Sequence, residues 1–83
     1  MPQPYMNNSS MKKRTSVLVF LRGAAAPLVL YVDNPQLLYE ELSGLLKKRA
    51  DVLVEKQLNG PIRKVCFNTA DVIAAAMQEE QYV

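Results

Sequence analysis

The hydrophobic positions of the chain first alternate with the period of a β-strand. From residue 15 onward, Val17, Val19 and Leu21 point to one side and Leu18 and Phe20 to the other, so both faces of this segment are apolar. A strand with two apolar faces belongs inside a sheet or under a helix. We therefore predict that this segment is a central strand.

A second alternating segment, residues 28–32, follows after a short break. Gly23 and the three alanines after it supply a turn. Pro27 fits only at the start of a strand, because it has no N–H to donate to a ladder. The two segments predict an antiparallel hairpin with a loop of about four or five residues.

The hydrophobic period then changes to that of an amphipathic helix. Asn34 is a residue type that caps free N–H groups, and Pro35 already has the backbone angle of a first helical residue, so we predict a helix over residues 35–49. One face carries leucines and the opposite face carries polar or small residues: Leu38, Leu42, Leu45 and Leu46 against Glu40, Ser43, Gly44 and Lys47. We expect the leucine face to lie on the sheet.

Two more strand-like segments, residues 51–58 and 62–68, flank Asn59-Gly60-Pro61. Asn-Gly is a strong signal for a tight hairpin because both residues tolerate positive φ angles. Pro61 is predicted to begin the returning strand. The first of these strands is more polar than residues 15–21, which places it nearer an edge of the sheet.

The last segment is compatible with two structures. The run of alanines at residues 74–76 and the Gln-Glu-Glu that follows have high helix propensity. Against this, Ile73, Ala75 and Met77 alternate with their neighbours, which indicates a turn at residues 69–71 and then a fifth strand. We favour the turn and strand, with a C-terminal helix as the alternative.

Together these elements predict an α+β fold. It is an antiparallel sheet of four or five strands, in the order β-β-α-β-β followed by the turn and fifth strand or the helix, with one helix packed on one face. With 83 residues, 49% of them hydrophobic, the chain can form one small domain. We predict a disordered tail at residues 1–13, whose first ten residues are uncharged and without periodicity, and a single domain at residues 14–83.

Positive charge is concentrated in two triplets. The chain carries a net charge of +2, but residues 1–14 account for +3, and residues 15–83 hold seven Lys and Arg against eight Asp and Glu, which gives −1. The candidate nucleic-acid contacts are Lys12, Lys13, Arg14, Lys47, Lys48 and Arg49. We favour a simpler interpretation of each triplet. The first is a solvated charged flank of the domain, and the second complements the negative end of the helix dipole.

The residue types needed for catalysis or metal binding are scarce. The chain has no histidine and one cysteine, Cys66, so it can form neither an intramolecular disulfide, nor a Cys/His nucleophile pair, nor a zinc cluster. Glu40 and Glu41 diverge by about 100° on a helix and cannot act on one substrate atom together. We predict no enzymatic activity, no catalytic or metal-binding residue and no cofactor.

Targeting signals are also not expected. The apolar run before Arg22 has five residues, which is shorter than the roughly 7–15 of a signal peptide. The longest apolar run without a charge, residues 23–32, is well below the roughly 18 residues of a membrane-spanning helix. We predict no membrane span and a cytoplasmic location.

Three short features resemble a family of short uncharacterised cyanobacterial proteins: Ala26-Pro27-Leu28-Val29, Leu38-Tyr39-Glu40-Glu41-Leu42 and Asp71-Val72-Ile73. The resemblance covers roughly residues 16–82. It supports the predicted fold, and it implies no activity and no site residues.

These observations predict a small non-enzymatic interaction or structural module. It would act through self-association as a homodimer or by docking to a larger protein, using a sheet edge or the exposed side of the helix. The alternative is a nucleic-acid-binding accessory protein with a basic N-terminal arm and a basic helix end. That alternative requires both basic triplets on one face, and few aromatic side chains are available to stack on bases.

Overall fold

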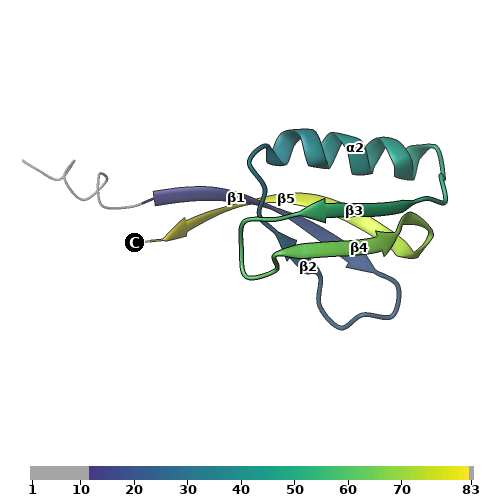
Figure 1. Ribbon diagram of the computed structural model, residues 1–83, viewed down its shortest axis with the longest axis horizontal. Helices are drawn as coiled ribbons and strands as arrows, with labels where there is room; N and C mark the ends of the chain where they lie inside the picture. The colour runs from purple at the N-terminus through teal and green to yellow at the C-terminus, as the bar shows by residue number, and fades with distance from the viewer. Residues whose placement is uncertain (1–11, 83) are drawn as a thin grey trace, which may run out of the picture.

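The computed structural model describes residues 12–82, which form one helix and five strands (Figure 1). The elements follow in the order β1 (Lys12–Leu21), β2 (Leu28–Leu30), α2 (Pro35–Lys47), β3 (Leu53–Gln57), β4 (Lys64–Asn68), the short 3-10 helix η1 (Thr69–Asp71) and β5 (Val72–Tyr82). The α+β class is confirmed. So is the favoured interpretation of the last segment, a turn followed by a fifth strand.

The strands form two antiparallel sheets, and the prediction of one sheet with four or five strands is wrong in this respect. The first sheet has the order β2-β1-β5, and the second contains β3 and β4. β2 is only three residues long, so its outer edge offers little backbone for a further ladder. The N–H of Asn59, just beyond β3, donates to the carbonyl of Tyr31, just beyond β2, at 2.7 Å.

β1 is the central strand of the first sheet, as its two apolar faces predict. Val17 and Val19 have no exposed surface, and they lie opposite Leu30 and Leu28 of β2. On the other side of β1, the same two valines lie opposite Met77 and Ala75 of β5. The ladder with β5 continues to Lys12 opposite Tyr82, so the strand begins inside the segment predicted as a tail. Residues 1–11 lie outside the described part of the chain.

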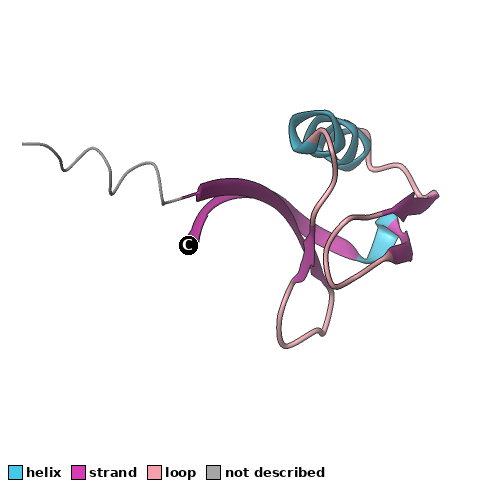
Figure 2. Cartoon of the chain, turned by 60° about the vertical axis from the view of Figure 1, so that its left-hand side comes forward, coloured by secondary structure: helices cyan, strands magenta, loops and turns pink. Residues whose placement is uncertain are grey.

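Only β1 and β5 continue into the outer part of the first sheet. β2 pairs with β1 at residues 17–19 alone, whereas the β1–β5 ladder runs on to residue 12. The two strands therefore form a ribbon that extends away from the rest of the fold, as Figure 2 shows. The ribbon ends close to the C-terminus of the chain.

The helix α2 begins as predicted. The side-chain oxygen of Asn34 accepts a hydrogen bond from the N–H of Leu37 at 3.1 Å, and Pro35 is the first helical residue. Leu38 and Leu42 are buried against the sheet, while Leu37 on the outer side is 61% exposed. α2 packs against β5 and β1. Its end at Lys47 comes two residues before the predicted end.

The loop between β3 and β4 is wider than the predicted hairpin turn. Six residues separate the strands, closed by the N–H of Leu58 donating to the carbonyl of Arg63 at 2.8 Å, and Pro61 lies in the loop rather than in the strand. Asn59 and Gly60 serve tertiary contacts instead of a two-residue turn. The Asn59 side chain donates to Asp33 at 2.7 Å, and a Cβ on Gly60 would overlap the ring of Tyr31.

One hydrophobic core joins the two sheets and the helix. Its buried members are Val17, Val19, Leu30, Leu38, Leu42, Val54, Leu58, Phe67 and Val72. An ion pair between Lys56 of β3 and Glu41 of α2, 2.9 Å apart, links the second sheet to the helix at the surface. The core positions are the alternating and helical apolar positions of the sequence, so burial follows its pattern closely.

Candidate interaction surface

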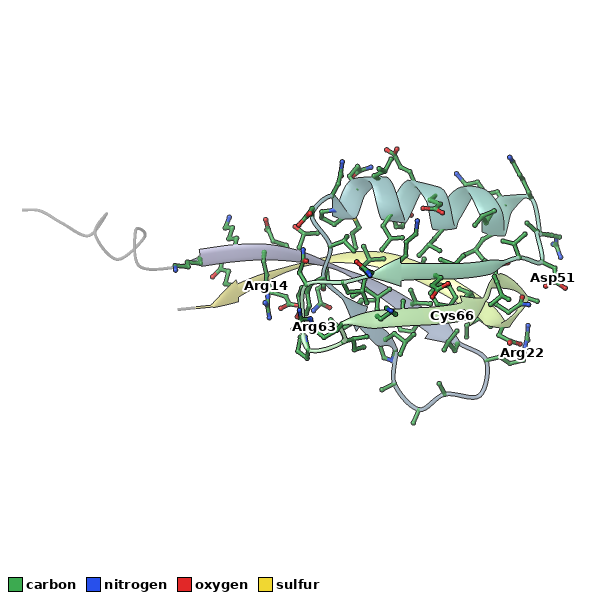
Figure 3. The ribbon with its side chains drawn as sticks, viewed as in Figure 1. Arg14, Arg22, Asp51, Arg63 and Cys66 are labelled. Carbon is green, nitrogen blue, oxygen red and sulfur yellow. The ribbon has the colours of Figure 1, made fainter. Side chains whose placement is uncertain are left out.

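The two basic triplets lie toward opposite ends of the molecule. Lys12, Lys13 and Arg14 begin β1 in the ribbon, whereas α2 ends with Lys47 near the far end of the long axis (Figures 1 and 3). Figure 3 labels Arg14 toward the left, near the base of the ribbon, and Asp51, just beyond the helix, at the right-hand end. The two triplets are therefore well separated along the long axis, and nucleic-acid contact through both of them stays a prediction.

The first triplet is held in a ladder. Its three residues lie opposite Tyr82, Gln81 and Glu80 of β5. The guanidinium of Arg14 stacks over the ring of Tyr31, with 3.8 Å from Cζ to the ring centroid, and its Nε lies 3.6 Å from Oε1 of Glu80. Arg14 thus takes part in internal structure at the base of the ribbon.

Glu80 is the centre of this polar cluster, which we call the ribbon cluster (Arg14, Ser16, Tyr31 and Glu80). The hydroxyl of Tyr31 lies 2.9 Å from both carboxylate oxygens, so one proton is shared between them, and the Ser16 hydroxyl donates to Oε2 at 3.0 Å. These hydrogen bonds from Tyr31 and Ser16 lower the pKa of Glu80 below its usual 4.5, and Arg14 adds to the effect. Burial and the bond to Glu80 raise the pKa of Tyr31 above 10.0. The cluster joins β1 and β5 to Tyr31, the residue that follows β2.

The second basic triplet forms the end of α2. The N–H of Ala50 donates to the carbonyl of Leu45 at 3.0 Å, and the N–H of Arg49 donates to that of Leu46 at 3.1 Å. This pair of hydrogen bonds is a Schellman motif, in which the residue after the cap is left-handed. Arg49 takes that position with a φ angle of 55°. Only Lys47 lies in the last turn of the helix itself, so the helix-dipole interpretation applies fully to one of the three cations.

Lys47 and Arg49 line a groove of about 590 Å³ between the end of α2 and the start of β5. Its other walls come from the connection to β3, from η1 and from the first two residues of β5, Val72 and Ile73. Thr69 is buried there, with its hydroxyl donating to the carbonyl of Ala50 at 2.7 Å. The groove therefore combines two cations, one carboxylate (Asp51) and an apolar side chain, Ile73, that is 61% exposed.

β5 supplies the exposed edge of the first sheet. In the described part of the chain it pairs with β1 on one side only. Its residues 72–78 carry no charge, proline or glycine, and Ile73 and Met77 are 61% and 41% exposed. Residues 72–78 thus carry none of the charges and prolines by which proteins usually prevent pairing with another strand. The ladder with β1 has one irregularity, where Ile73 is an extra residue between Val72 and Ala74. The sequence had pointed to a sheet edge in general, but it could not identify β5, because edge position depends on long-range pairing.

The face of the first sheet that points away from the core adds apolar surface beside this edge. Leu18, Phe20 and Val29 alternate with the buried positions and are half-buried, while Ala74 of β5 is exposed and Ala76 half-buried. Leu18 lies opposite both Val29 and Ala76, so these side chains form one continuous row across the sheet. This row and the β5 edge meet at the alanines.

Within residues 12–82 there is no group of three or more His, Cys, Asp or Glu side chains that could hold a metal ion. The thiol of Cys66 is exposed on β4. No helix between residues 12 and 82 is long and apolar enough to cross a membrane.

The chain matches no protein-family model, no curated protein and no solved structure. The resemblance to short cyanobacterial proteins therefore stays a prediction.

Proposed function

We propose that this protein is a non-enzymatic interaction module that binds a protein partner by strand addition at the edge of β5. The observation that carries the proposal is the combination of an unpaired edge and exposed apolar side chains on one strand. Backbone N–H and C=O groups along such an edge supply affinity to an added strand, and alternate side chains supply specificity. Ile73 and Met77 would be the side chains that a partner covers.

The exposed side of α2 is a weaker candidate for the contact. Leu37 is as exposed as Ile73, at 61%, but its neighbours on the outer face of the helix are polar or charged. Isolated apolar residues of this kind are normal on protein surfaces. At β5, by contrast, the apolar residues continue into the row of Leu18, Val29 and Ala76.

A site-specific photo-crosslinking experiment tests the proposal. A photoreactive amino acid replaces Met77, which is 41% exposed, in the full chain, and a control variant carries it at Leu37, which is 61% exposed but lies on the helix. After irradiation in cells that carry the natural gene, we expect crosslinked protein products from position 77 and few from position 37. Equal yields at both positions, or none at position 77, would refute docking at the β5 edge.

A further inference from the structure

From the geometry of the β5 edge we infer that its occupant is the β5 strand of a second copy of this chain, in an antiparallel register centred on Ala76. The inference rests on the proposed function, because it names the partner at the same edge. The result is a symmetric dimer with a continuous six-stranded sheet of order β2-β1-β5-β5-β1-β2.

The register follows from charge. A two-fold axis perpendicular to the sheet keeps the same face of both copies on the same side, so one residue of the strand must lie opposite itself. Centring on Ala75 would bring Glu79 of the second copy beside Asp71, the last residue of η1, and two carboxylates close together are unfavourable. Centring on Ala76 instead brings Glu79 of the second copy beside Ile73, the extra residue at the irregularity of β5. Between residues 73 and 79, no like charges then face each other.

The same register completes the groove at the end of α2. Ile73 lines that groove together with Lys47 and Arg49. In an antiparallel pair, directly opposite residues point to the same face of the sheet, so Glu79 of the second copy would point to the face on which Ile73 lies. Each copy thus brings an acidic strand end to the groove of the other, where Lys47 and Arg49 outnumber the single carboxylate of Asp51. This complementarity arises twice by symmetry and favours a second copy over an unrelated strand.

Apolar contacts support the pairing along its middle. Met77 of one copy would lie opposite Ala75 of the other, and Ala76 opposite itself. Small residues at the axis let the two strands approach without steric conflict. The row of Leu18, Val29 and Ala76 would continue across the axis into the corresponding row of the second copy.

Disulfide trapping tests the register directly. In a Cys66→Ser background, Ala76→Cys places two thiols opposite each other, where the Cα separation of an antiparallel pair, about 4.5–5.5 Å, falls within disulfide range. Ala74→Cys is the matched control, since its two copies would be four residues apart along the strands. We expect oxidation to give a covalent dimer for Ala76→Cys and no more dimer for Ala74→Cys than for the parent. Equal trapping at both positions, or none at 76, would overturn the register.

Sedimentation velocity tests the charge contact and the partner. We expect a concentration-dependent dimer that is weakened by salt, lost in Ile73→Lys and retained in the equally exposed control Leu37→Lys. Glu79→Lys and Lys47→Glu should each weaken the dimer at least tenfold, and the double variant should recover most of the loss. A wild-type protein that stays monomeric at all concentrations refutes the dimer. If position 77 still crosslinks to other proteins in that case, the proposed function stands; if it does not, both fail.

Discussion

Replacing Arg49 with glycine should stabilise the protein, although it removes a charged residue from the end of a helix. Arg49 has a φ angle of 55° because the Schellman motif at the end of α2 requires a left-handed residue at this position. Side chains with a Cβ are strained there, since the Cβ comes too close to the following carbonyl oxygen. Glycine has no Cβ and adopts this conformation freely.

The magnitude follows from two opposing effects. The left-handed conformation costs an ordinary residue roughly 1–2 kcal/mol. Glycine gains more conformational freedom in the unfolded chain, which offsets about 0.5–1 kcal/mol of that benefit. A net gain of about 0.5–1 kcal/mol remains, which in a domain of this size corresponds to a rise of roughly 2–8 °C in the melting temperature.

The matched control is Lys48→Gly. Lys48 precedes Arg49 and has right-handed helical angles, φ −84° and ψ −7°. The control removes the same charge from the same turn, but it relieves no strain, so it should destabilise the protein by about 0.5–1 kcal/mol. The two substitutions should therefore change the free energy of unfolding in opposite directions, so that the variants differ from each other by about 1–2 kcal/mol.

Urea denaturation followed by circular dichroism measures both differences. The experiment is done in the Ile73→Lys background, so that association at β5 does not contribute to the free energy of unfolding. If Arg49→Gly lowers the urea midpoint as Lys48→Gly does, the positive charge matters more than backbone strain at the end of α2, and the reasoning is refuted.

Three further predictions use the same unfolding assay. Gly44→Ala should stabilise by about 0.5–1 kcal/mol, because a Cβ at this helical position meets nothing within 4 Å; a loss of stability would contradict that open space. Leu42→Ala, at a side chain that is 1% exposed, should cost about 2–5 kcal/mol, whereas Leu37→Ala, at 61% exposure, should change stability by less than about 0.5 kcal/mol. The lowered pKa of Glu80 stabilises the fold above pH 4.5, and this contribution is lost as the pH falls from 4.5 through the folded pKa. The difference in unfolding free energy between wild type and Glu80→Gln should therefore shrink as the pH falls from 6 to 3. A difference that stays constant would show that the ionised Glu80 carboxylate in the ribbon cluster does not contribute this stability.

Only part of the candidate interaction surface could be predicted from the sequence. The six basic residues were visible as charge runs, but their separation to opposite ends depends on the course of β1 and α2 through the fold. Ile73 and Met77 were visible as alternating apolar positions, which alone indicate core as readily as surface. The hydrogen bonds that join Tyr31 and Ser16 to Glu80 connect residues 49 and 64 positions apart, and no local pattern contains that information.

Local patterns in the sequence determined the type of most elements. Asn34 and Pro35 start the helix because capping and a fixed φ angle are properties of the residues themselves. The alternation around Val17 and Val19 predicted a central strand because two apolar faces are stable only when both are covered. The leucines of α2 predicted the side that packs on the sheet for the same reason.

The tertiary structure alone decided the features that depend on distant partners. Residues 74–76 are alanines with high helix propensity, yet they form a strand because β1 provides a long ladder for them. Lys12 and Lys13 extend β1 because β5 continues opposite them to Tyr82. The division into two sheets and the exposure of the β5 edge also follow from which strands pair. Pairing depends on hydrogen bonds and packing between segments far apart in the chain, and a local pattern cannot specify them.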